Sequence, residues 1–155
     1  MIKSIQQFQT EGVKKLEKVF VDYSGDMTRF AEMVYGVRDG VLELARDMIV
    51  EELESYDEWL RKSERRKEQW QIVRRDKSTL LTSIGSITYH KTLFRDKQNG
   101  QAEYLLDRCM GLEKHARITE DAEAAVLMEA VESSYRKGGE HASIGRDGIL
   151  SLIHI

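Results

Sequence analysis

The chain has 155 residues and a formal net charge of −3, and charged residues make up 33% of it against 41% hydrophobic residues. This length suits one ordinary domain, the apolar content excludes a disordered chain, and the negative charge excludes a uniformly basic coat for nucleic acid. Because Cys109 is the single cysteine and no segment resembles a signal peptide or a membrane span, we expect a cytoplasmic protein.

Two amphipathic helices are expected at the amino-terminal end. Apolar residues recur at steps of three and four over residues 2–20, and a second, longer helix is predicted over residues 30–62. We expect the two to form an antiparallel hairpin within residues 1–64, which would also serve as the arm through which a homodimer forms. Gly36 and Gly40 lie four residues apart in the long helix, which favours close helix packing over a functional hinge.

Charge is segregated along the next part of the chain. Residues 43–58 carry seven carboxylates and one arginine, a net of −6, whereas residues 61–77 carry eight cations and three carboxylates, a net of +5. We interpret the acidic run as a solvated helix face rather than a site for a divalent cation. The end of the basic run, residues 65–77, is expected to be a connector.

The basic run is the strongest candidate for contact with DNA, because clustered cations displace counterions from a polyanion. The alternative is a solvated helix end that neutralises the acidic face of another copy. The candidate DNA-binding residues in this run are Arg61, Arg65, Arg66, Lys67, Arg74, Arg75 and Lys77.

A β-hairpin module is expected over residues 78–112. The run that begins at Leu80 alternates, is rich in threonine, isoleucine, tyrosine and phenylalanine, and turns at Gly85. A second turn is expected at Asn99-Gly100, followed by a short strand with the sequence YLL. The predicted fold class is therefore mainly α with a small β-hairpin (α+β). A weaker basic edge is expected on the hairpin from Lys91, Arg95 and Lys97.

Two short helices are expected over residues 113–149. Helical spacing of apolar residues begins after Thr119, the candidate N-cap, and a second segment, YRKGGEHA, follows. Its Arg136 and Lys137 are further candidates for DNA phosphates, with a solvent-exposed turn as an equal alternative. The final residues, 150–155, resemble a translated sequencing adapter, so we expect a non-native tail without an apolar groove to receive it.

The residue pattern offers no catalytic or metal-binding site. The four histidines lie 25, 26 and 13 residues apart, and Cys109 has no CxxC companion, so zinc spacing is lacking. Phosphate-binding glycine loops of the GxGxxG and GKS types are also lacking. We therefore expect no enzyme activity, no cofactor and no small-molecule substrate for this chain.

The ordered series TLLTSIG, YLLDR, MGL, ARITED and SSYRKGGE resembles the amino-terminal region of the ISLre-type insertion-sequence transposases, a bacterial family of the aspartate-aspartate-glutamate class. The resemblance covers roughly residues 1–149. It implies an amino-terminal fragment that binds transposon-end DNA and oligomerises, with a partial helix-turn-helix over residues 113–149 whose recognition helix is missing.

The same resemblance implies that the catalytic carboxylates lie in a domain absent from this chain, so Mg²⁺ is expected only for that missing domain. The alternative is a stand-alone helical protein-interaction module that does not bind DNA. A metal-dependent enzyme built on the acidic helix face ranks last.

Overall fold

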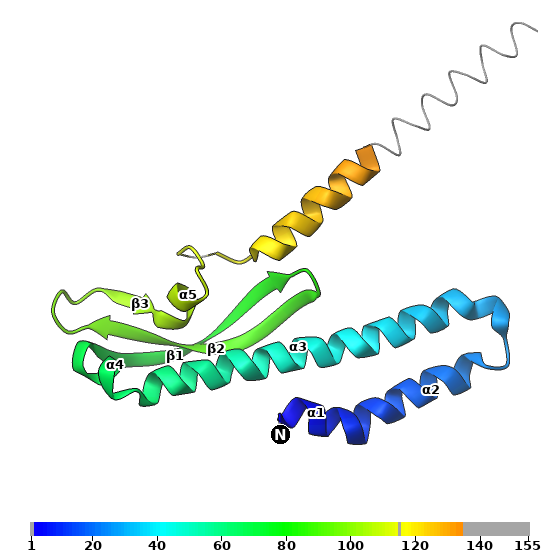
Figure 1. The fold of residues 1–155 in the computed structure, drawn as a ribbon, viewed down its shortest axis with the longest axis horizontal. Coiled ribbons are helices and arrows are strands. Elements are labelled where there is room, and N and C mark those ends of the chain that lie inside the picture. The colour runs from blue at the N-terminus through cyan, green and yellow to red at the C-terminus, as the bar shows by residue number, and fades with distance from the viewer. Residues whose placement is uncertain (1, 115, 135–155) are drawn as a thin grey trace, which may run out of the picture.

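The computed structural model describes residues 2–114 and 116–134 as one long helix with a sheet on one side and the amino-terminal helices on the other (Figure 1). The expected fold class, mainly α with a small antiparallel sheet (α+β), is confirmed. The elements are, in order, α1 (Lys3–Gln7), the π-helical turn η1 (Phe8–Gly12), α2 (Val13–Tyr23), the 3-10 turn η2 (Met27–Arg29), α3 (Phe30–Lys62), α4 (Glu64–Gln69), β1 (Trp70–Thr82), β2 (Gly85–Asp96), β3 (Ala102–Tyr104), α5 (Leu105–Cys109) and a helix over residues 120–134.

The amino-terminal helices run antiparallel to the first half of α3, as the hydrophobic periodicity predicts (Figure 1). A Cβ atom added to Gly36 would lie 2.9 Å from Val19 Cγ1, and one added to Gly40 would lie 2.8 Å from Leu16 Cδ2. Both distances are shorter than ordinary van der Waals contact. The two glycines therefore allow α2 to approach α3 closely, which confirms the packing interpretation.

The sheet has the order β1-β2-β3 with antiparallel neighbours. The β1–β2 ladder runs from Trp70 opposite Asp96 to Thr82 opposite Gly85, with a bulge between Ile72 and Arg74. Residues 70–77 of the expected connector are therefore strand. Trp70, Ile72 and Val73 indicate an extended chain in the sequence, but the basic residues of the segment obscure the alternation that would identify a paired strand.

The expected YLL strand is only partly a strand. Tyr104 ends β3, whereas Leu105 and Leu106 begin α5 and are both buried. Consecutive positions of a strand point to opposite faces, but a helical turn places both leucines against the core. The prediction of a strand through Leu106 is therefore wrong.

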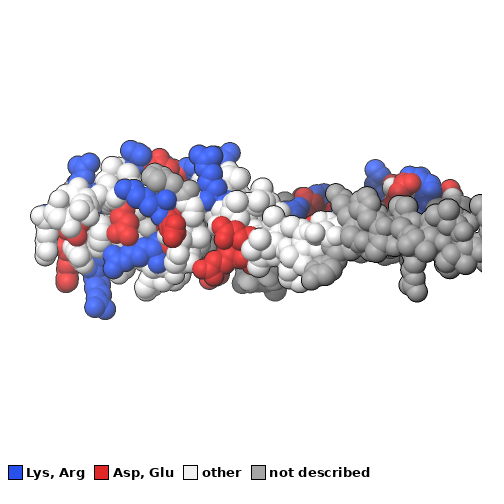
Figure 2. Space-filling model, turned by 90° about the horizontal axis from the view of Figure 1, so that it is seen from above, with Lys and Arg blue, Asp and Glu red and all other residues white. Residues whose placement is uncertain are grey.

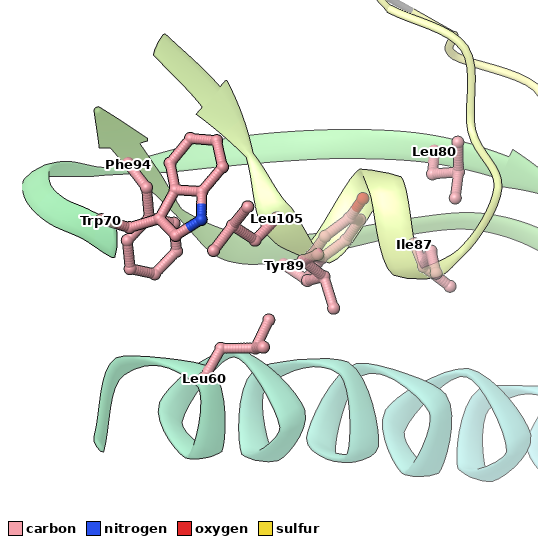
Figure 3. Close-up of a cluster of buried hydrophobic side chains, with 8 residues drawn as sticks. Leu60, Trp70, Leu80, Ile87, Tyr89, Phe94 and Leu105 are labelled. Carbon is pink, nitrogen blue, oxygen red and sulfur yellow. The ribbon is translucent and has the colours of Figure 1, made fainter. Parts of the chain in front are cut away.

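The core lies where α3, the sheet and α5 meet. Figure 3 shows Leu60 projecting from α3 toward this cluster. Phe94 is 0% and Tyr89 is 1% exposed, and burial raises the pKa of Tyr89 to about 12. The buried apolar cluster consists of Leu60, Trp70, Leu80, Ile87, Tyr89, Phe94, Leu105 and Leu106.

The helix over residues 120–134 is attached to the end of β1. Leu81 donates its N–H to the carbonyl of Arg117 (2.8 Å) and accepts from the N–H of Thr119 (3.0 Å). Thr119 precedes the helix, as expected, but its hydroxyl donates to the Leu81 carbonyl (3.0 Å). The expected second short helix, with Arg136 and Lys137, and the tail 150–155 lie outside the described residues.

Candidate nucleic-acid interface

The acidic run on α3 supplies hydrogen-bond acceptors to the backbone of the sheet. Because β3 pairs with residues 93–95 of β2, the preceding outward N–H groups of β2 have no strand partner among the described residues. The N–H of Thr92 donates to Asp57 Oδ1 (2.9 Å) and its hydroxyl donates to Oδ2 (2.7 Å). The N–H of His90 donates to Glu54 Oε1 (2.8 Å).

The expectation of a solvated acidic face is therefore wrong for Glu54 and Asp57, whereas Glu43, Asp47 and Glu52 are exposed. Asp57 is 0% exposed. It lies four residues after Leu53 and three before Leu60, on the apolar side of the helix. That spacing is the sequence signal that could have identified Asp57 as an inward-facing residue.

Glu51 performs a similar role for the amino-terminal helices. Its two carboxylate oxygens accept hydrogen bonds from the N–H groups of Ser4 and Lys3, both at 2.7 Å. These two backbone hydrogen bonds lower the pKa of Glu51. Burial raises the pKa of Glu54, but the hydrogen bonds from His90 and the charge of Arg75 outweigh it, so the net shift is downward.

Within residues 2–114 and 116–134, no group of three or more histidine, cysteine, aspartate or glutamate side chains is placed to hold a metal ion. None of the helices in this part of the chain combines the length and the apolar character that crossing a bilayer requires.

Arg66 differs from the other predicted DNA-binding residues because its guanidinium is turned toward the protein. It donates to the carbonyls of Leu60 and Trp70, both at 3.2 Å, and also to that of Arg61. It also lies 5.4 Å from the centre of the Phe94 ring. Arg66 thus joins the end of α3 to the start of β1, and its charge is less available to an outside ligand.

Four of the predicted cations form ion pairs. Arg61 pairs with Glu58 (2.7 Å), Arg74 with Asp76 (2.9 Å) and Arg75 with Glu54 (3.4 Å), and Lys67 pairs with Glu64. The hydrogen bond from Tyr104 and the charge of Arg74 lower the pKa of Asp76. Each pair reduces the net positive potential near that cation.

Arg65 and Lys77 are exposed and form no ion pair with any described residue. Lys77 lies on β1 together with Arg74 and Arg75, and Arg65 lies on α4 immediately before this strand. Side chains alternate along a strand, so Arg75 and Lys77 lie on one face of β1 and Arg74 lies on the opposite face.

The position of β1 at the edge of the sheet makes these cations accessible. Beyond its bridge between Leu81 and Ile118, the outer side of β1 has no strand partner among the described residues. Charged side chains on an edge strand also prevent unwanted pairing with other sheets. Figure 2 shows, on the face seen from above in Figure 1, cations interspersed with carboxylates, so this face carries no uniform basic coat.

The weaker basic edge expected on the hairpin is not continuous. Lys91 has a side chain only 12% exposed, forms an ion pair with Asp107 and lies 4.4 Å from the centre of the Tyr104 ring. Lys97 donates to the carbonyl of Lys67, whereas Arg95 is exposed. The prediction that Lys91 belongs to an exposed basic edge is therefore wrong.

The fold and this surface define an α+β module with a basic edge strand. Residues 24–153 match the family described as "Uncharacterised protein family (UPF0236)". The chain belongs to this family.

Similar proteins come from Caldanaerobacter subterraneus subsp. tengcongensis (strain DSM 15242 / JCM 11007 / NBRC 100824 / MB4). One UPF0236 protein, whose name carries eleven locus designations, is 29% identical over 143 residues, which cover 90% of this chain and 31% of that protein. Another, whose name carries four designations, is 28% identical over 129 residues, or 83% of this chain and 28% of that protein. The chain thus spans about a third of the length of these relatives. No solved structure matches it.

Proposed function

We propose that this chain is the amino-terminal, DNA-binding portion of a longer bacterial protein that acts in DNA transposition in the cytoplasm. The observation that carries the proposal is the pair of exposed cations that form no ion pair with a described residue, Arg65 on α4 and Lys77 on the edge strand β1. Side chains of this kind contact phosphates without reading bases, so binding is expected to be independent of sequence.

The relatives give independent support for transposition. One protein name that joins eleven locus designations of a single strain indicates that very similar genes occur at many places in one genome. An element that copies itself produces this distribution. The chain covers only 31% of that relative, which leaves room in the longer protein for the catalytic domain, with its carboxylates and Mg²⁺, that the proposal requires.

The test compares two charge-reversed variants of the full chain. Arg65→Glu/Lys77→Glu changes the proposed interface, whereas Lys14→Glu/Lys18→Glu makes the same change of net charge on exposed positions of α2. Binding to a labelled duplex is measured by fluorescence anisotropy at several salt concentrations, with two unrelated DNA sequences.

The interface variant is expected to bind both duplexes more weakly, and the slope of log K against log salt should decrease by about 0.9 for each phosphate that the variant no longer neutralises. The α2 variant should bind like the unchanged protein. Equal weakening in both variants, or no weakening in either, would contradict the proposal. Equal and negligible binding by all three proteins would favour the alternative of a protein-interaction module without DNA binding.

A further inference from the structure

Helix α3 has three sides, and the described part of the chain covers two of them. One side contacts α1 and α2, and another contacts the sheet and α5 (Figure 1). The third side carries exposed apolar side chains. We call this third side the α3 stripe. Its members, with their exposed fractions, are Phe30 (53%), Val34 (47%), Val41 (49%), Ile49 (38%), Tyr56 (39%) and Trp59 (59%).

The area of the α3 stripe is comparable to that of known interaction patches. Aromatic side chains each present about 150–250 Å² when fully exposed, so the three in the stripe expose about 300 Å² together. That is already within the range of the largest apolar patch on a typical monomer, and such patches commonly mark interaction sites. At 1.5 Å per residue the stripe is about 44 Å long, a length that suits another long helix.

The order of residues in the stripe points to a second copy of this chain as that partner. The stripe is nearly palindromic about Ala45: Val41 and Ile49 each lie four residues away, and Val34 and Tyr56 each lie eleven residues away. Phe30 and Trp59 lie fifteen and fourteen residues away. In an antiparallel pair of α3 helices that cross at Ala45, each of these side chains therefore meets an apolar side chain of the other copy.

We propose that two copies of the chain form a dimer through the α3 stripe, with the two α3 helices antiparallel and a two-fold axis at Ala45. Ala45 has a small side chain, which permits the helices to approach closely where they cross. The interface is isologous, so each contact occurs twice.

Two charged residues within the stripe favour the antiparallel orientation. Arg38, which also pairs with Asp39 of its own chain (3.0 Å), and Glu52 are exposed and lie seven residues before and seven after Ala45. They occupy the same side of the helix because fourteen residues make about 3.9 turns. The antiparallel pair places Arg38 opposite Glu52 of the partner subunit, twice. A parallel pair would place Glu52 opposite Glu52 of the partner subunit and align the acidic runs, which costs free energy.

The test exploits this predicted ion pair. The oligomeric state of the full chain is measured by sedimentation equilibrium over a wide concentration range, for Arg38→Glu, for Glu52→Arg and for the double variant. Each single reversal should raise the dimer Kd on the order of tenfold, because two surface pairs become repulsive. The double variant should restore the original Kd, and the control Lys18→Glu on α2 should not change it.

A second measurement determines orientation directly. In a Cys109→Ser background, protein with Arg38→Cys is mixed with protein with Glu52→Cys and oxidised. Antiparallel pairing predicts disulfide formation chiefly between the two different chains, whereas parallel pairing predicts it between like chains.

A chain that stays monomeric at all concentrations, a double variant no better than the singles, or cross-linking between like chains would each overturn the proposal. The first result would assign the stripe to the rest of the longer protein. Dimerisation is measured without DNA, so its failure is distinguishable from a failure of DNA binding.

Discussion

Replacing Asp57 by alanine tests whether α3 stabilises the sheet by accepting its hydrogen bonds. The change removes two acceptors and leaves the N–H and the hydroxyl of Thr92 buried without partners. Hydrogen bonds to a charged group contribute about 1.5–3 kcal/mol each, so the loss of two should lower the free energy of unfolding by about 3–6 kcal/mol. This is a large part of the 5–15 kcal/mol typical of small proteins.

The measurement is urea denaturation followed by the fluorescence of the buried Trp70 and of Trp59. Asp57→Asn keeps an acceptor for the Thr92 N–H and should lose roughly half as much as the alanine variant. Asp47→Ala, at an exposed position on the same helix, is the matched control and should change stability by less than about 0.5 kcal/mol. If Asp57→Ala is as mild as this control, the hydrogen bonds from α3 do not stabilise the sheet.

Three further predictions concern stability. Arg66→Lys should lower the free energy of unfolding by about 2 kcal/mol in urea denaturation, because an ammonium group cannot reproduce the donors that reach the carbonyls of Leu60 and Trp70. A smaller change than that of the control Arg65→Lys would show that Arg66 does not join α3 to β1. Gly36→Leu should lower the free energy of unfolding by about 1–3 kcal/mol, because the new side chain would push α2 away from α3. Gly25→Ala, which has open space around it, should be neutral. Equal shifts of the melting temperature in the two variants would argue against close packing of α2 on α3. The folded-state pKa values of Glu51 and Glu54 are lowered, so the stability they contribute is present above their ordinary value of about 4.5 and is lost as the pH falls below it. The urea midpoint of the unchanged protein should therefore decrease as the pH is lowered, and that of the Glu51→Gln/Glu54→Gln variant should decrease less steeply. If the two proteins show the same dependence on pH, these carboxylates do not contribute the pH-dependent stability.

Local patterns in the sequence were enough to predict the helical hairpin and the turn at Gly85. The three- and four-residue periodicity over residues 30–62 identifies α3, and Gly85 adopts a φ of 111°, a conformation that favours glycine. Extended chain from Trp70 was indicated by the sequence, but its pairing as the first part of β1 was not, because that pairing depends on Phe94 and Asp96, more than twenty residues away. Propensity alone does not contain that information.

The candidate site was predictable in its composition but not in its geometry. The sequence identifies residues 61–77 as basic, yet the acceptors that turn Arg66 inward are carbonyls of other segments. The burial of Lys91 likewise depends on another segment, because its ion-pair partner Asp107 lies on α5. Which cations remain accessible is therefore decided by tertiary contacts.

The helix-to-sheet hydrogen bonds also bear on how the chain folds. The β1–β2 hairpin closes a short loop and can form early, but the N–H groups of His90 and Thr92 find their acceptors on residues 36 and 35 positions earlier in the chain. Until α3 docks, these groups can bond only to water, and an isolated hairpin is marginally stable. Helix docking and completion of the sheet are thus expected to occur in a single cooperative step, with the search for this distant contact setting the folding rate.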